Sequence, residues 1–166
     1  MTRTRHGSAI VTFPSDLEIL TTRELDAPIE LVFDVLTKPE HVRRWFAPFE
    51  CKMTVCSADL RVGGGYHFAF VTEDGTECSF RGTYLEIEPP VRIVDTWLFE
   101  GWPDAHAVET VELHEEAGVT TVSMKLAFDD RAGRDHMTMF DGQESSYDKM
   151  EDYLRALLDA GATAAG

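Results

Sequence analysis

The stretch from Glu50 to Phe128 constrains the fold more than any other part of the chain. Clusters of turn-forming residues divide it into six strand-like segments, at approximately 50–58, 65–72, 77–88, 91–99, 106–115 and 118–128. The connections are too short for crossovers, so neighbouring strands must run antiparallel. This part of the sequence therefore predicts a six-stranded antiparallel meander.

Alternation within the strands predicts which faces of the sheet are covered. In 118–128, apolar side chains alternate with Thr121, Ser123 and Lys125, which indicates one buried face and one face in water. In 65–72, both alternating sets contain apolar residues, which indicates partial cover on both faces.

Strands and short helices are expected before the meander. The β-type runs 9–13 and 18–25 predict one broken strand or a small hairpin. Asp26 then occupies an N-cap position with Pro28 in the first turn, which predicts a helix through the apolar positions that follow. A second short helix is expected at 40–46, before Pro48.

One long helix is expected after the meander. It would begin after Asp129 and Asp130 and continue to about Ala160, with Gly142 as a weak point inside it. Its apolar stripe should lie on the sheet and consists of Tyr147, Met150, Leu154, Leu157 and Leu158.

Length and charge narrow the class of protein. The chain of 166 residues predicts one domain, at 9–160, between flexible ends at 1–8 and 161–166. Thirty acidic residues against 15 basic ones give a formal net charge of -15, which disfavours nucleic acid and anionic lipid as partners. No apolar run suits a secretory signal or a membrane span, so we expect a soluble, cytoplasmic protein.

The cysteines and histidines predict no metal site and no cofactor. Cys51, Cys56 and Cys78 form no C-x-x-C pair and are expected to be packing thiols of a reducing compartment. Histidines fall on separate elements, and only His114 stands beside carboxylates, at a turn where a solvated hairpin tip is expected. The three glycines at 63–65 lack the Lys-Ser/Thr of a phosphate loop and predict a turn.

Several motifs together resemble a known family. They include Leu25-Asp26-Ala27-Pro28, Thr37-Lys38-Pro39-Glu40-His41, Trp45-Phe46-Ala47-Pro48, Asp59-Leu60-Arg61-Val62-Gly63-Gly64 and Arg81-Gly82-Thr83-Tyr84-Leu85-Glu86-Ile87 followed by Pro89-Pro90. In this order, over about 11–158, the sequence is similar to the activator of heat shock protein 90 ATPase-like family. That family belongs to the START-like, or SRPBCC, superfamily.

The resemblance implies an α+β helix-grip fold, START-like and Bet v 1-like. In this fold a curved antiparallel sheet wraps around a long C-terminal helix, with two short helices after the first strand. The superfamily includes lipid carriers, hormone receptors and polyketide cyclases, so the fold does not fix the activity. Many relatives carry a Gly-Trp pair in the last helix, where this chain has Gly142-Gln143.

A helix that fills only part of a curved sheet leaves room for a ligand pocket. We expect apolar and aromatic side chains of the middle strands and the last helix to line it. The candidates are Trp45, Phe46, Tyr66, Phe68, Tyr84, Trp97, Met124, Met137, Phe140 and Tyr147.

Three side chains are candidates for chemistry in that pocket. His67 lies in a strand with apolar residues on both faces, where a partly buried imidazole could polarise a ligand, although a structural histidine is the simpler interpretation. Asp95 and Glu109 lie in neighbouring strands and could supply a buried acid whose pKa the apolar cavity raises. No feature singles out a serine nucleophile.

Three functions remain open from the sequence. The leading hypothesis is a non-enzymatic protein that binds a small apolar or amphipathic molecule, and the second is an enzyme of the aromatase/cyclase or hydrolase type. The third, suggested by the family, is a chaperone-associated module that meets a protein partner through an acidic face at Glu109, Glu112, Glu115 and Glu116. A homodimer is compatible with the sequence, although no feature requires one.

Overall fold

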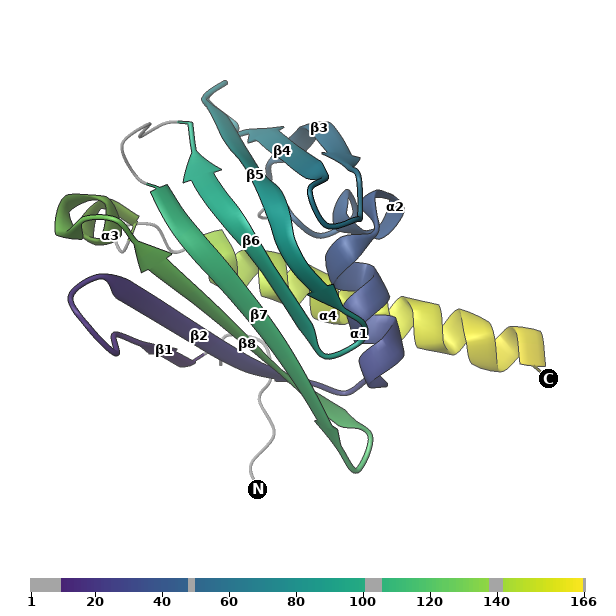
Figure 1. Cartoon of the computed structure of the whole chain (residues 1–166). Helices are drawn as coiled ribbons and strands as arrows, with labels where there is room; N and C mark the ends of the chain where they lie inside the picture. Colours follow the sequence, from purple (N-terminus) through teal and green to yellow (C-terminus); the bar gives the residue numbers. More distant parts are fainter. Residues whose placement is uncertain (1–9, 48–49, 101–105, 138–141, 166) are drawn as a thin grey trace.

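A single antiparallel sheet organises the molecule. The computed structural model describes residues 10–47, 50–100, 106–137 and 142–165. Within these ranges, eight strands form one sheet in the order β1-β2-β8-β7-β6-β5-β4-β3 (Figure 1). The predicted meander consists of β3 (Lys52–Ala58), β4 (Gly65–Val71), β5 (Glu77–Glu88), β6 (Arg92–Phe99), β7 (His106–Glu116) and β8 (Val119–Phe128). The α+β prediction is confirmed.

The two N-terminal strands extend the sheet beyond the meander. β1 (Ile10–Thr12) pairs antiparallel with β2 (Glu18–Leu25), so the hairpin is the correct one of the two alternatives. β2 then pairs along its whole length with β8, the last strand of the meander. The β1–β2 hairpin is thereby brought next to the strand that precedes the C-terminal helices.

Local backbone geometry explains the tight connections and the irregular pairing. Ala117 and Gly118 have φ values of 53° and 78°, the left-handed pair that a two-residue hairpin between β7 and β8 requires. A register shift between Tyr84 and Glu86 interrupts the β5–β6 ladder. Such bulges bend a strand and increase its twist, which helps the sheet to curve.

The helices before the meander differ in detail from the prediction. α1 (Ile29–Thr37) has Pro28 rather than Asp26 at its N-cap, and no side chain of the cap residue bonds the helix end. Instead, Glu115 of the distant β7–β8 hairpin accepts a hydrogen bond from the Ile29 backbone N–H at 2.6 Å. α2 (Pro39–Val42) is shorter than the predicted 40–46.

The single C-terminal helix predicted from Asp130 onward is two helices. α3 (Arg131–Met137) begins where Asp130 Oδ1 accepts a hydrogen bond from the Gly133 N–H at 2.7 Å. The described part of α4 (Gly142–Ala165) includes the glycine that was expected to weaken a continuous helix. Figure 1 shows α3 and α4 as separate helices, so the long C-terminal helix is present but is not one continuous helix from Asp130 onward; the residues between the two, 138–141, lie outside the described part of the chain.

α4 lies across one face of the sheet, and its C-terminal turns extend past α1 (Figure 1). Tyr147, Met150 and Leu154 are buried, as the stripe predicted, whereas Leu158 is 36% exposed. The overhang of the last turns explains this difference. No helix within the described ranges has a stretch apolar and long enough to cross a bilayer.

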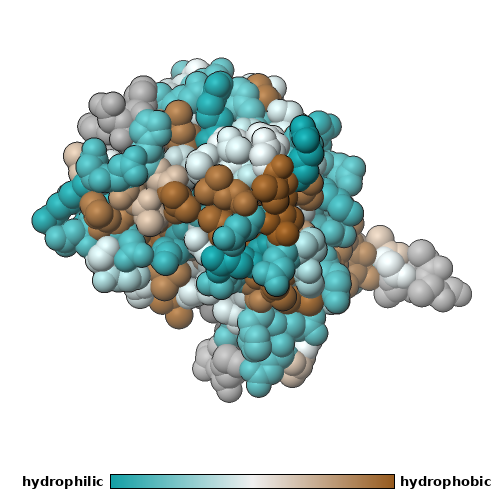
Figure 2. All heavy atoms as spheres, in the orientation of Figure 1, coloured by the Kyte–Doolittle hydropathy of each residue, from teal (hydrophilic) through white to brown (hydrophobic). Residues whose placement is uncertain are grey.

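The opposite face of the sheet looks outward. Figure 2 views this face and shows hydrophobic side chains among polar ones near its middle. Leu85 and Val108, on β5 and β7, are 45% and 40% exposed. Exposed apolar residues are common on protein surfaces.

A buried ion pair holds α4 against β2. Arg23 is 1% exposed, and its Nη2 lies 2.6 Å from Glu151 Oε2 and 2.9 Å from Asp148 Oδ1. Its guanidinium carbon also lies 5.9 Å from the centre of the Tyr147 ring. Because Glu151 is itself only 5% exposed, removal of the arginine would leave a buried carboxylate without this partner.

We expect Arg23→Leu to lower the free energy of unfolding by about 3 kcal/mol, the usual effect of breaking a buried pair from one side. Urea denaturation followed by circular dichroism measures it. Arg81→Leu is the matched control, because Arg81 pairs with Glu100 on the surface with its own side chain 54% exposed, where such pairs contribute little. Equal effects of the two substitutions would contradict the assigned role of Arg23.

Candidate functional site

A cavity of about 1110 Å³ lies between the sheet and the helices. Inward-facing side chains of β2, β4, β5, β6, β7 and β8 line it, together with residues of α1, α2, α3 and α4. This volume exceeds the few hundred cubic ångströms that a small cofactor needs. The space between sheet and last helix that the fold class predicts is therefore present and large.

Nine of the ten predicted cavity residues line this space, and the tenth, Phe140, lies outside the described residues. The nine are Trp45, Phe46, Tyr66, Phe68, Tyr84, Trp97, Met124, Met137 and Tyr147. Strand alternation explains most of them, since every second residue of β4, β6 and β8 points toward α4.

Further aromatic rings complete the wall. Phe80 lies 5.6 Å from both Phe46 and Trp97 and 5.0 Å from Phe99, measured between ring centres. Phe70, Phe80 and Phe99 also line the cavity but were not among the predicted residues. The same alternation that identified Phe68 would have identified Phe70.

Two carboxyl groups interrupt this apolar wall. Asp95 on β6 and Glu109 on β7 are directly paired across the strands, and their side chains hydrogen-bond each other. Both line the cavity, and Asp95 is 3% exposed. Tyr66 donates a hydrogen bond from its hydroxyl to Asp95 Oδ1 at 3.0 Å. We call Asp95 and Glu109 the carboxyl pair.

Backbone register places Tyr66 and Tyr84 against the carboxyl pair. Tyr84 is the β5 partner of Asp95, immediately before the register shift in that strand. Tyr66 reaches the pair from β4 by passing over Gly82, where an added Cβ would collide with the Thr96 carbonyl and come too close to the Tyr66 ring. The glycine thus leaves the space that the Tyr66 ring uses.

Burial controls the ionisation of these groups. It is the main cause that raises the pKa of Asp95, and the neighbouring Glu109 charge raises it further. Burial also raises the pKa of Glu109. The pKa values of Tyr66 and Tyr84 are raised first by burial and then by the charge of Asp95. The carboxyl pair therefore holds a shared proton more tightly than exposed carboxyls would.

The histidine candidate does not belong to this arrangement. His67 lies between Tyr66 and Phe68 on β4, so its side chain points to the outer face of the sheet, and it does not line the cavity. Its Nε2 lies 2.7 Å from Ser79 Oγ and 3.7 Å from Glu100 Oε1. These contacts make His67 part of a surface network, so the hypothesis that its imidazole polarises a ligand in the cavity was wrong.

The three cysteine thiols differ in whether they line the cavity. All three cysteines are free, and Cys51 and Cys78 line the cavity. Burial raises the pKa of Cys78, and the nearby charge of Cys51 adds to the effect. Among the described residues, no group of three or more His, Cys, Asp or Glu side chains could hold a metal ion.

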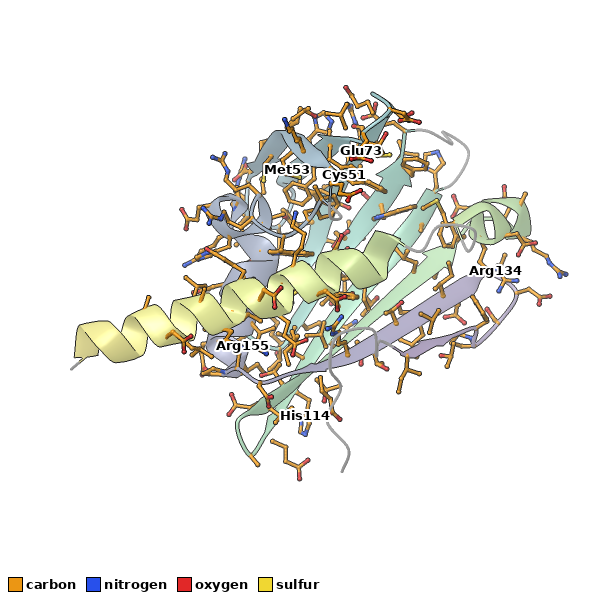
Figure 3. All side chains as sticks on the ribbon, turned by 180° about the vertical axis from the view of Figure 1, so that it is seen from behind. Cys51, Met53, Glu73, His114, Arg134 and Arg155 are labelled. Atoms are coloured by element: carbon orange, nitrogen blue, oxygen red, sulfur yellow. The ribbon has the colours of Figure 1, made fainter. Side chains whose placement is uncertain are left out.

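The mouth of the cavity carries exposed acidic residues. Glu50, Glu73 and Asp74 all line it and are all exposed. Figure 3 shows Cys51 and Glu73 close together at one end of the sheet, with His114 at the opposite end. The hydroxyls of Thr72 and Thr76 hold the pKa of Asp74 below its usual range, so this carboxylate stays ionised.

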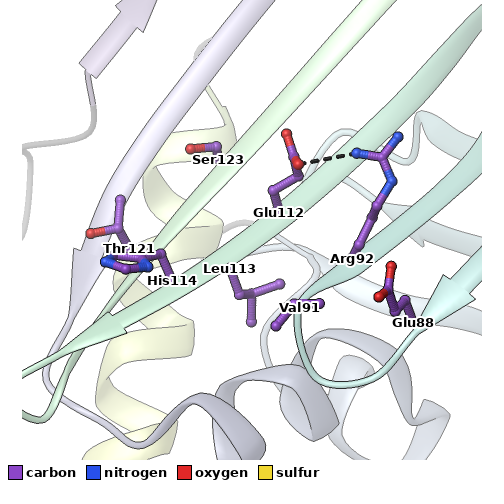
Figure 4. A pocket seen from close by; sticks show the side chains of 8 residues that line it. All are labelled: Glu88, Val91, Arg92, Glu112, Leu113, His114, Thr121 and Ser123. Atoms are coloured by element: carbon purple, nitrogen blue, oxygen red, sulfur yellow. Dashed lines mark hydrogen bonds and ion pairs between the residues drawn. The ribbon is translucent and has the colours of Figure 1, made fainter.

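A second, shallower pocket of about 350 Å³ lies near the β5–β6 turn (Figure 4). Its one arginine, Arg92, lies 3.0 Å from Glu86 and 3.0 Å from Glu112, so its charge is already paired. The pocket is open and offers few apolar side chains. It is the weaker candidate for a ligand site.

The four glutamates predicted to form one acidic face do not share a face. Glu109 points into the cavity, whereas Glu112, Glu115 and Glu116 are exposed. Glu115 also bonds the first turn of α1. That surface is therefore smaller than the sequence suggested.

Comparisons with known proteins give one family and many similar folds. The family model described as "Activator of Hsp90 ATPase homolog 1-like protein" matches residues 26–155. A solved structure from Rhodobacter sphaeroides is 20% identical, with a TM-score of 0.82, and the match covers 89% of this chain and 99% of that chain. No curated protein matches this chain in sequence.

Two further solved structures are similar at slightly higher identity. One, from Nitrosomonas europaea, is 25% identical with a TM-score of 0.75, over 87% of this chain and 98% of that chain. The other, from Chromobacterium violaceum, is 26% identical with a TM-score of 0.72, over 84% of this chain and 98% of that chain. Both matches extend over nearly the whole length of the other chain, which supports the helix-grip architecture of this one.

The carboxyl pair makes stability depend on pH. Because both pKa values are raised in the folded state, that state binds more protons than the unfolded state above the ordinary carboxyl range, and the free energy of unfolding falls as pH rises. We expect Asp95→Asn/Glu109→Gln to flatten this decline and to be more stable than wild type by at least about 1 kcal/mol near pH 8. Urea denaturation between about pH 5 and pH 8 measures both.

Glu112→Gln is the control for that experiment, because Glu112 lies on the same strand and faces outward. The free energy of unfolding of this variant should change with pH in the same way as that of wild type. A double variant at Asp95 and Glu109 that also ran parallel to wild type would contradict the raised pKa values.

Proposed function

This chain belongs to the family of Activator of Hsp90 ATPase homolog 1-like proteins, and from that premise and its cavity we propose that it binds a small apolar or amphipathic molecule between the sheet and α4. The observation that carries the proposal is the cavity of about 1110 Å³ with predominantly aromatic and aliphatic walls. An apolar space of this size would lose stabilising contacts if it remained unfilled.

The lining supports an amphipathic ligand better than a purely apolar one. Phe46, Phe80 and Trp97 offer apolar area, while Asp95 and Glu109 offer hydrogen bonds at one point of the wall. Binding sites for small molecules commonly combine an apolar lining with a few polar groups that fix orientation. Met124 and Met137 add flexible side chains that adapt to different shapes.

We expect Val111→Trp to weaken binding of the neutral fluorescent probe N-phenyl-1-naphthylamine at least about tenfold. Val111 lines the cavity and is 7% exposed, so a larger side chain there occupies the space of the ligand. Fluorescence titration measures the affinity.

Val108→Trp is the matched control, since Val108 lies on the same strand, faces outward and is 40% exposed. It should bind the probe as wild type does. Because Val111→Trp could itself disturb folding, Leu126→Trp on β8 provides a second block of the same cavity. A wild-type protein without measurable probe binding would contradict the proposal.

A second candidate function is acid–base catalysis in the same cavity, of the kind that an aromatase/cyclase requires. The carboxyl pair favours it, because protonated Asp95 could donate to a carbonyl oxygen while ionised Glu109 accepts a proton from the neighbouring carbon. Glu109 gains the proton that leaves the carbon, and Asp95 loses the proton that the oxygen receives. The ketone thereby becomes an enol with no net change in charge.

We expect, if this second function holds, that the protein exchanges the methyl protons of 2-acetonaphthone with D₂O faster than buffer does. Glu109→Gln should slow that exchange about 100-fold, the usual contribution of a general base. Mass spectrometry of the ketone measures it, with Glu112→Gln as the outward-facing control. Bound ketone that exchanges no faster than in buffer would exclude the carboxyl pair as an acid–base device.

A further inference from the structure

The charged residues of the cavity are all of one sign. Of the described residues that line it, five are acidic and none is Lys, Arg or His. The acidic ones are Glu50, Glu73, Asp74, Asp95 and Glu109. Three of these stand at the mouth, and the other two form the carboxyl pair inside.

The carboxyl pair has no cationic partner within the described part of the chain. Asp95 receives a hydrogen bond from Tyr66, and Glu109 bonds Asp95, but no basic side chain pairs with either. Arg23 is the most deeply buried arginine of the described residues, and it pairs with Asp148 and Glu151 of α4 instead. Buried carboxyl groups normally have a counter-charge, so this pair is unusual.

Aromatic rings surround the same space. Tyr66 and Tyr84 lie with ring centres 5.5 Å apart beside the carboxyl pair, and Trp97 is the next inward-facing residue after Asp95 on β6. The faces of such rings attract cations. Walls of this kind combined with carboxylates are the chemistry that recognises an ammonium group attached to an apolar body.

Resting on the proposed binding function, we propose that the ligand of this cavity is an amphipathic cation, an apolar or aromatic molecule with a basic nitrogen that docks on Asp95 and Glu109. The ammonium group supplies the counter-charge that the pair lacks, and the apolar body occupies the aromatic part of the cavity. Glu50, Glu73 and Asp74 at the mouth attract such a cation and repel anions.

Proton linkage distinguishes this ligand from a neutral one. An ammonium group favours the ionised carboxyl pair, so its binding displaces protons, and the affinity rises as pH rises until the pair is ionised. The other titratable groups that face the pair are Tyr66 on β4 and Tyr84 on β5. Cys56 on β3 is near Tyr84, and its charge would raise the pKa of that tyrosine. Their pKa values are raised, which leaves them uncharged in this range.

Three probes with one aromatic body test the proposal: 2-(1-naphthyl)ethylamine, 2-(1-naphthyl)ethanol and 1-naphthaleneacetate. Isothermal titration calorimetry at about pH 7.5 should give the amine at least about tenfold higher affinity than the alcohol, and the acetate the lowest. Between about pH 5.5 and pH 7.5 the amine should gain at least about tenfold in affinity, while the alcohol should not change.

The variants assign the effect to the carboxyl pair. Asp95→Asn/Glu109→Gln should lose both the preference for the amine over the alcohol and the pH dependence of amine binding. Glu50→Gln/Glu73→Gln/Asp74→Asn, at the mouth, should keep the preference and lower only the salt-sensitive part of the association rate.

The outcomes separate this inference from the function on which it rests. If the alcohol binds wild type as tightly as the amine, the cation proposal is overturned and the binding function stands. If the preference for the amine survives in the carboxyl-pair variant, the assignment to Asp95 and Glu109 is overturned. If none of the three probes binds, both the inference and the binding function are contradicted.

Discussion

The position of α4 decides how much of the concave sheet remains open. Arg23 fixes the helix over β2 through Asp148 and Glu151, and Tyr147, Met150 and Leu154 complete that contact. One helix cannot cover eight strands, so the inner faces of β4 to β7 stay accessible to a ligand. The cavity is thus a consequence of where the helix is held, and its lining is a consequence of strand alternation.

Within that lining, the carboxyl pair is the electrostatic exception. Asp95 and Glu109 are brought together by a direct cross-strand pairing, and a single residue of register shift would move them to the outer face. Their burial without a basic partner destabilises the ionised form, which is why their pKa values rise. Titratable groups whose pKa values are shifted by burial in this way are frequently found at binding or catalytic sites.

Periodicity and turn chemistry were sufficient to predict the sheet and most of the cavity wall. The meander, the N-terminal hairpin and residues such as Trp97 and Met124 follow from alternation alone. The division of the last helix was not predicted, because Asp130 and Gly142 are compatible with both a continuous and a broken helix. The pairing of Arg23 with α4 was missed, because a single arginine in a strand carries no sign of a partner 128 positions away.

The Cys78 thiol in the cavity wall is held in its un-ionised form. Burial raises the pKa of Cys78, and the charges of Cys51, Asp74 and Glu77 oppose its ionisation further, so the sulfur remains a thiol at neutral pH. Thiols are far weaker nucleophiles than thiolates. An electrophile in the cavity would therefore meet a thiol rather than a thiolate at Cys78, and would react with it only slowly.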